Sequence, residues 1–344
     1  MSDANKPLEA FGLALAVLVA LAFAPALGAG FVFDDVLLLV NTDCYHGLSR
    51  IPEFFTSPYD ACDYRPMRYV TYAVDYTIAG TAPWIYHLTN ILFHIGSVWL
   101  GWLVLGRLAG WRSADRAPQI TQAAMILAAA ALLFYGLHPV QADAVVPAAG
   151  RRDVQSTFLF LAALWAWLKR RDGRAPVWIG FSVVLWGLAL LTKEMAVTLP
   201  AVILLAEVTA PGLSDEPPSA RLKALMRRTW PVWVLLGAVT VAFVLYRGVF
   251  VSHSNMAGRW WGGSLGSNIL NIILIQGQYA AMILWPQTLV GDYAQYTVPL
   301  ADGLTDVRVW WGFVVMAAVA AAVVLSALGS LRRPTPHRLG SGRP

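Results

Sequence analysis

The sequence predicts an all-α integral membrane protein with about eight transmembrane helices and one further segment that is re-entrant or juxtamembrane. Composition is the first reason: 58% of the residues are hydrophobic and only 13% are charged, whereas a soluble domain carries about 25% charged residues. Repeated apolar runs are the second reason, because a hydrocarbon core about 30 Å thick needs roughly 20 apolar residues per helix. Both features place the chain in a bilayer.

Eight apolar runs have the composition of membrane spans. They are residues 10–32, 84–106, 121–138, 154–168, 176–192, 196–210, 230–250 and 309–331. The first run ends in small residues that resemble a signal-peptidase site, but it is long and follows a single lysine, so we expect a retained helix. Residues 1–331 then form a single transmembrane domain, and residues 332–344 form a short basic tail.

The apolar stretch 267–285 differs from these runs because amide side chains interrupt it. They are Asn268, Asn271, Gln276 and Gln278. Polar groups in hydrocarbon are costly unless they find partners, so this stretch is predicted to be re-entrant or to lie along the outer face.

Basic residues set the expected orientation. Most of the 25 Lys and Arg residues fall in segments on one side of the predicted spans, and cytoplasmic loops retain such charge. We therefore expect a multi-pass protein of the plasma (inner) membrane with both termini in the cytoplasm. The net charge of +5 then reflects topology and not nucleic-acid binding.

The longest predicted outer loop, residues 34–83, is acidic and contains both cysteines of the chain, Cys44 and Cys62. Two thiols confined to one outer loop predict a disulfide in an oxidising compartment. Two unpaired thiols are the alternative. The loop begins with Asp34 and Asp35, directly after the first span.

Charged residues also crowd two further outer connections. They are His138, Asp143, Arg151, Arg152 and Asp153 in one connection, and Lys193 and Glu194 in the other. Charges beside hydrocarbon are costly unless they are paired or functional. Each charge could simply pair with a neighbour and hold two helices together. Jointly they indicate a site for an anionic headgroup.

Carboxylates that accept a proton or bind a metal, together with Arg and Lys that hold phosphate, fit group transfer from a lipid phosphate. The sequence has no P-loop, no glycine-rich dinucleotide motif, no HExxH and no zinc-type cysteine cluster, which disfavours the chemistries that depend on these motifs.

Seven motifs in order resemble the membrane domain of the transmembrane and tetratricopeptide-repeat containing O-mannosyltransferases, within the GT-C superfamily of membrane glycosyltransferases. They are FVFDD with the later Asn41, YRPM at 64–67, YHLTNILFH at 86–94, HPVQADAV at 138–145, GRRD at 150–153, TKEMAVT at 192–198 and LWPQTLVGDY at 284–293. The resemblance implies a GT-C-like fold and an inverting enzyme that transfers a sugar from polyprenyl phosphate to a hydroxyl of a protein or glycolipid acceptor outside the cytoplasm.

The resemblance also implies roles for individual residues. Asp34 or Asp35 falls at the catalytic carboxylate, and we favour Asp35 as the base, with Asp34 organising the loop. The predicted donor-phosphate residues are Arg65, His138, Arg151, Arg152 and Lys193, and the supporting residues are Glu194, Asp143 and His87. Asp143 and Gln141 stand where related sequences more often have Glu and His. No organic cofactor is predicted, and a divalent metal is left open.

A second function remains open at this point. The tail after residue 331 carries no tetratricopeptide repeats, and the usual C-terminal helices of the superfamily are mostly missing. These departures favour an inactive GT-C-derived subunit that packs with other membrane subunits. Many of the 15 tryptophans lie near span ends, which suits either a subunit interface or an ordinary interfacial belt. A flippase or transporter is disfavoured, because no span carries the expected internal charges.

Overall fold

A computed structural model of the chain describes residues 6–56, 64–109, 118–209, 218–251, 260–287, 289 and 298–331. Within these ranges all regular structure is helical. The predicted all-α membrane class is therefore confirmed.

In the part of the chain that the structure describes, five helical segments are long and apolar enough to cross a membrane. They are Ala10–Gly28, in α1 (Lys6–Phe23) and the short helix after it; Pro83–Ala109, which is α4; Leu222–Tyr246, in α10 (Pro218–Val251); Leu265–Leu284, which is α11; and Val307–Gly329, in α12 (Val307–Leu331). A sixth span is formed if α5 (Pro118–Leu137) and the segment Pro139–Val145 are taken together, although they are bent by 46°. Pro139 explains the bend, because proline disfavours helical geometry in the preceding residue.

The other predicted spans correspond to shorter or more charged helices, so eight crossings are not confirmed. They are α7 (Arg151–Lys169), which begins with three charged residues, α8 (Ala175–Leu190) with 16 residues and α9 (Leu199–Thr209) with 11. An 11-residue helix is only about 16 Å long, roughly half the thickness of a hydrocarbon core. The predicted span 196–210 is longer than α9, because it includes residues of the 3-10 turn Glu194–Thr198 that precedes this helix.

The stretch expected to be re-entrant is one unbroken helix, α11, and by length and composition it could cross. Two of its amide side chains, Asn268 and Asn271, have hydrogen-bond partners within the chain. Asn271 is 2% exposed, donates to the carbonyl oxygen of Ser267 at 2.9 Å and accepts from the backbone N–H of Ala301 at 2.7 Å. One unbroken helix of this length is not a re-entrant loop, whereas the alternative course along the outer face and the placement of both termini in the cytoplasm stay predictions.

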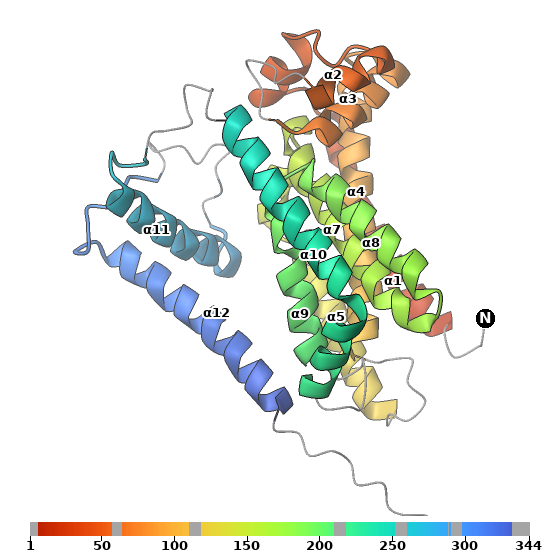
Figure 1. The fold of residues 1–344 in the computed structure, drawn as a ribbon. Helices are drawn as coiled ribbons and strands as arrows, with labels where there is room; N and C mark the ends of the chain where they lie inside the picture. The colour runs from red at the N-terminus through yellow and green to blue at the C-terminus, as the bar shows by residue number, and fades with distance from the viewer. Residues whose placement is uncertain are drawn as a thin grey trace, which may run out of the picture.

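Helix α4 lies at the centre of the main bundle and contacts α1, α5 and α7, while α7 and α8 form a closely packed antiparallel pair (Figure 1). The core between α7, α8 and α9 contains the fully buried side chains of Trp167, Trp186 and Ile203. Helices α11 and α12 form a second pair beside the bundle. There, Gly312 lies directly against the carbonyl oxygen of Ile273, so that a Cβ at this position would overlap it.

The predicted outer loop folds into a cap at one end of the bundle. It contains α2 (Ile51–Thr56) and α3 (Pro66–Ala79), drawn in orange in Figure 1. Buried aromatic rings hold it together; for example, the rings of Tyr45 and Tyr69 stack with centroids 4.8 Å apart. Cys44 is half-buried and forms no disulfide with another described residue. Its predicted partner Cys62 lies outside the described residues, so the disulfide stays a prediction.

Ion pairs hold the opposite end of the bundle. Glu207 on α9 is fully buried and pairs with Arg170 at 2.6 Å and also with Arg171, both in the turn after α7. The indole N–H of Trp167 also donates to the Glu207 carboxylate, at 3.4 Å. The basic residues of the turn after α7 thus fasten α7 to α9.

Candidate functional site

A cavity of about 820 Å³ lies where the connection after α5, the start of α7, the turn after α8 and the end of α11 come together. Its polar and charged lining residues are Gln141, Asp143, Arg152, Asp153, Thr157 and Lys193. Apolar and aromatic residues, including Phe33, Tyr135, Tyr279 and Met282, line the rest. A cavity of this size fits a small ligand, and its lining suits one with both polar and apolar parts.

Two cations and one carboxylate form a charged group on the cavity wall. Lys193 pairs with Asp153, and the Nε atom of Arg152 lies 3.4 Å from a carboxylate oxygen of the same Asp153. The side chains are partly open, with 20% of Lys193 and 38% of Arg152 exposed. With Asp143, which also lines the cavity, the two cations and two carboxylates balance in charge, and a bound phosphate could accept hydrogen bonds from both cations.

Helix geometry explains why Arg152 and its neighbour Arg151 differ. Successive helical residues point about 100° apart, so the two adjacent arginines at the start of α7 face different surroundings. Arg152 reaches the cavity, whereas Arg151 is 0% exposed.

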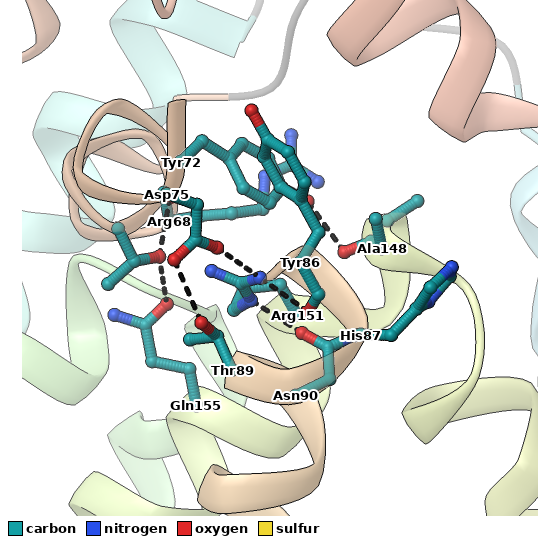
Figure 2. A network of polar contacts seen from close by, with 12 residues as sticks. Arg68, Tyr72, Asp75, Tyr86, His87, Thr89, Asn90, Ala148, Arg151 and Gln155 are labelled. Carbon is teal, nitrogen blue, oxygen red and sulfur yellow. Dashed lines mark hydrogen bonds and ion pairs between the residues drawn. The ribbon is translucent and has the colours of Figure 1, made fainter. Parts of the chain in front are cut away.

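Figure 2 shows that Arg151 belongs to a buried polar network between α3, α4 and α7. Its guanidinium group lies 2.7 Å from the Asp75 carboxylate and donates to the carbonyl oxygen of Tyr86 at 2.8 Å and to the side-chain oxygen of Asn90. Asp75 also accepts from the Thr89 hydroxyl at 2.8 Å. Burial raises the pKa of the Asp75 carboxyl, and the charge of Arg151 opposes that shift.

We expected Arg151 to bind the phosphate of the sugar donor, but its guanidinium group is buried against Asp75. Removing one partner of a buried ion pair leaves an uncompensated charge, so we assign Arg151 to the stability of the bundle. The same α4 segment holds the turn before α7 through its side chains. The Nδ1–H of His87 donates to the Val146 carbonyl oxygen at 2.7 Å, and the Asn90 amide donates to that of Pro147, also at 2.7 Å.

His87 is fully buried in this arrangement and His138 is 7% exposed. The Nε2–H of His138 donates to the carbonyl oxygen of Ile283 at 3.0 Å, while its Nδ1 accepts from the backbone N–H of Val140 at 3.2 Å. With both ring nitrogens engaged, His138 fastens the end of α5 to α11. Each histidine thus holds a backbone segment in place, His87 at Val146 and His138 at Ile283.

The two aspartates at the end of the first span lie in different surroundings. Asp35 is 0% exposed and accepts from the backbone N–H groups of Ala149 at 2.7 Å and Val32 at 3.3 Å. It ties the first loop to the turn before α7. Asp34 is exposed and directly follows Phe33, a cavity-lining residue. The accessible carboxylate is Asp34.

Arg65 and Glu194 form an ion pair at 3.4 Å that joins the start of α3 to the turn after α8. Of the predicted donor-phosphate and supporting residues, the described part of the chain brings Arg152, Lys193 and Asp143 to the cavity. Sequence reasoning missed Phe33 and undervalued Asp153. Asp153 belongs to the GRRD motif, which was the available signal. Among the described residues there is no group of three or more His, Cys, Asp or Glu side chains that could hold a metal ion.

Comparison with known proteins supports the family resemblance that the sequence motifs predict. No family model and no solved structure matches the chain, so the GT-C-like architecture stays a prediction. The chain is 28% identical to Protein O-mannosyl-transferase Tmtc2 of Drosophila melanogaster over 305 residues, which cover 82% of this chain and 30% of that protein. It is 27% identical to Protein O-mannosyl-transferase TMTC3 of Mus musculus over 92% of this chain and 35% of that protein.

These findings define a multi-pass helical membrane protein with a cavity lined by polar, charged and apolar side chains. The predicted resemblance is confirmed: over most of its length the chain is similar to the TMTC protein O-mannosyl-transferases, including TMTC3 of Homo sapiens at 24% identity. The chain spans about a third of the length of these curated relatives.

Proposed function

We propose that this chain transfers a mannosyl residue from a polyprenyl-phosphate donor to a hydroxyl group of a protein acceptor. The observation that carries the proposal is the cavity that unites Arg152 and Lys193 with Asp143 and Asp153. One residue of its lining, Phe33, directly precedes the exposed Asp34. The similarity to proteins named protein O-mannosyl-transferases supports the sugar and the acceptor class.

In the proposed reaction, Arg152 and Lys193 hold the donor phosphate through charge-assisted hydrogen bonds. The acceptor oxygen attacks the anomeric carbon from the face opposite the phosphate, and a new C–O bond forms with inversion. The bond between the anomeric carbon and the phosphate oxygen breaks, and polyprenyl phosphate leaves with the electron pair. Because negative charge develops on that phosphate oxygen, fixed cations beside it lower the barrier.

The proton of the acceptor hydroxyl goes to the Asp34 carboxylate in this proposal. Asp34 is exposed, and no ion pair of its carboxylate occurs among the described residues, whereas Asp35 is fully engaged by backbone N–H groups. Asp143 lines the cavity but already has another partner within the chain, so we give it the supporting role of orienting the acceptor hydroxyl.

We further propose that the cavity faces away from the cytoplasm of a plasma membrane. The basic turn after α7, with Lys169, Arg170 and Arg171, lies at the end of the bundle opposite the α2–α3 cap (Figure 1). Positive charge at one end favours that end as the cytoplasmic side. The donor lipid would then reach the cavity from the outer leaflet.

A transfer assay with purified protein, mannosyl polyprenyl phosphate and an acceptor peptide tests the proposal. Asp34→Asn should lower kcat by about 10²- to 10⁴-fold, the typical contribution of a positioned base, without lowering the unfolding temperature. Lys193→Met should raise KM for the donor and also lower kcat, because this cation both binds the phosphate and stabilises it as it leaves. Glu53→Gln is the control, because this carboxylate is an exposed partner of Arg50 on α2, and it should behave as wild type.

Full activity of Asp34→Asn would remove the proposed base. A wild-type protein that binds no lipid phosphate and transfers no sugar, yet is required for assembly of a membrane complex, would replace the enzyme by the subunit function.

A further inference from the structure

We infer that Phe33 is a stacking platform for the hexose ring of the donor; this inference rests on the proposed function. Phe33 lines the cavity, and 70% of the residue is exposed. Its position immediately before Asp34 would set a ring stacked on it beside the proposed base, because adjacent Cα atoms are only about 3.8 Å apart.

The backbone at Phe33 is held in an unusual conformation that presents the side chain. Its φ angle is 45°, in the left-handed region that bulky L-residues avoid. Strained backbone persists only where surrounding contacts impose it, and such positions cluster at functional sites. No glycine, asparagine or aspartate relieves the strain here; an aromatic residue occupies the position.

Contacts on both sides of Phe33 impose this conformation. Before it, the backbone N–H of Val32 donates to the Asp35 carboxylate at 3.3 Å, and that carboxylate is anchored on the Ala149 N–H at 2.7 Å. After it, the carbonyl oxygen of Phe33 accepts from the N–H of Val36 at 3.2 Å, where a π-helix, Val36–Val40, begins. Short π-helical segments are frequent at functional sites.

Phe31, two residues earlier, shows how a phenylalanine of the same segment packs when it belongs to the core. The Phe31 ring packs edge-on against Tyr86 with centroids 5.4 Å apart, and the residue is half-buried. An unstrained strand-like segment would direct both rings to the same side. The turn at Phe33 instead leaves one ring in the core and the other on the cavity wall.

The chemistry of the cavity selects a sugar as the occupant over a purely apolar chain. A hexose has a face of C–H groups and a rim of hydroxyls. Polarised C–H groups favour the negative face of an aromatic ring, and Gln141, Asp143 and Lys193 supply hydrogen-bonding groups in the same cavity. Membrane anchoring alone would need neither the strained backbone nor the charged neighbours.

Binding measurements on the purified full chain test the inference with two soluble probes, mannose 1-phosphate and inorganic phosphate. Phe33→Leu keeps the apolar character but removes the aromatic face. It should weaken binding of mannose 1-phosphate by several-fold to about tenfold, the range expected for loss of an aromatic contact, and leave binding of inorganic phosphate unchanged. Phe33→Trp should bind both probes like wild type. Lys193→Met should weaken the binding of both.

Two further variants separate stacking from folding. Phe33→Gly fits the positive φ, so it should unfold at the same or a higher temperature than wild type while losing the same mannose 1-phosphate affinity as Phe33→Leu. Trp84→Leu alters another exposed aromatic residue, at the start of α4 and not among the residues that line the cavity, and should bind both probes normally.

The outcomes distinguish the two ideas. If wild type binds mannose 1-phosphate through Lys193 and Phe33→Leu binds it equally well, the stacking inference is overturned while the proposed function stands. Equal losses for both probes in Phe33→Leu would also overturn stacking, because the whole loop would have been disturbed. If wild type binds neither probe, the proposed function fails together with the inference.

Discussion

Replacing Arg151 by methionine separates the role predicted from the sequence from the role found in the structure. Methionine retains much of the side-chain volume but removes the charge that faces the Asp75 carboxylate at 2.7 Å. Asp75 is 2% exposed, so its carboxylate would stay in the bundle without a cation. If the structural role is correct, Arg151→Met loses stability before it loses affinity for the donor.

The size of the effect follows from that burial. Breaking a buried ion pair by removing one partner costs about 3–5 kcal/mol. With a typical unfolding entropy of roughly 2 cal/mol/K per residue, a chain of 344 residues should lose about 4–7 °C in unfolding temperature.

The penalty in Arg151→Met should also depend on pH. Burial already raises the pKa of Asp75 against the opposing charge of Arg151, and the variant removes the opposition. A carboxyl whose pKa is higher in the folded state favours folding when it is protonated. The deficit should therefore shrink as the pH falls through the raised pKa of Asp75 and return as the pH rises above it.

Thermal unfolding in detergent at several pH values, together with donor KM, measures these effects. The matched control is Arg152→Met, which changes a cavity-lining residue with a 38% exposed side chain and should raise KM with little change in unfolding temperature. Adding Asp75→Asn to Arg151→Met should restore part of the lost stability. The reasoning is refuted if Arg151→Met unfolds like wild type but binds donor poorly.

Three other outcomes are expected. Glu207→Ala should cost about 3–5 kcal/mol in thermal unfolding, since Arg170 and Arg171 lose their buried partner; a shift no larger than that of exposed Glu53→Ala contradicts this. Gly312→Ala should destabilise the α11–α12 pair by about 1–3 kcal/mol, because the added Cβ overlaps the Ile273 carbonyl; the control Gly329→Ala, with open space around it, should be neutral. Finally, Cys44 and Cys62 should resist alkylation in denatured protein until a reductant is added, as mass spectrometry would show; labelling of both thiols without reductant argues against the bond, which a chain-entropy model credits with about 3 kcal/mol.

The local sequence pattern was sufficient to predict the features that depend on the average hydropathy of about 20 consecutive residues. The all-helical membrane class and the runs that became α1, α4, α10 and α12 follow from hydropathy. The motifs around the outer connections also predicted the resemblance to O-mannosyltransferases that comparison bears out. The number of membrane crossings could not be predicted in this way, because the hydropathy of a run of residues does not show where the helix begins and ends.

The sequence by itself determined that charged residues gather in a few connections between apolar runs, including two adjacent pairs, Asp34 with Asp35 and Arg151 with Arg152. Tertiary structure alone decided which member of each pair is buried. Asp35 is held by a residue 114 positions away, and Arg151 contacts Asn90, 61 positions away. Neighbouring side chains point in different directions along a helix or turn, so the availability of a charge to a ligand depends on which distant segment packs against each face.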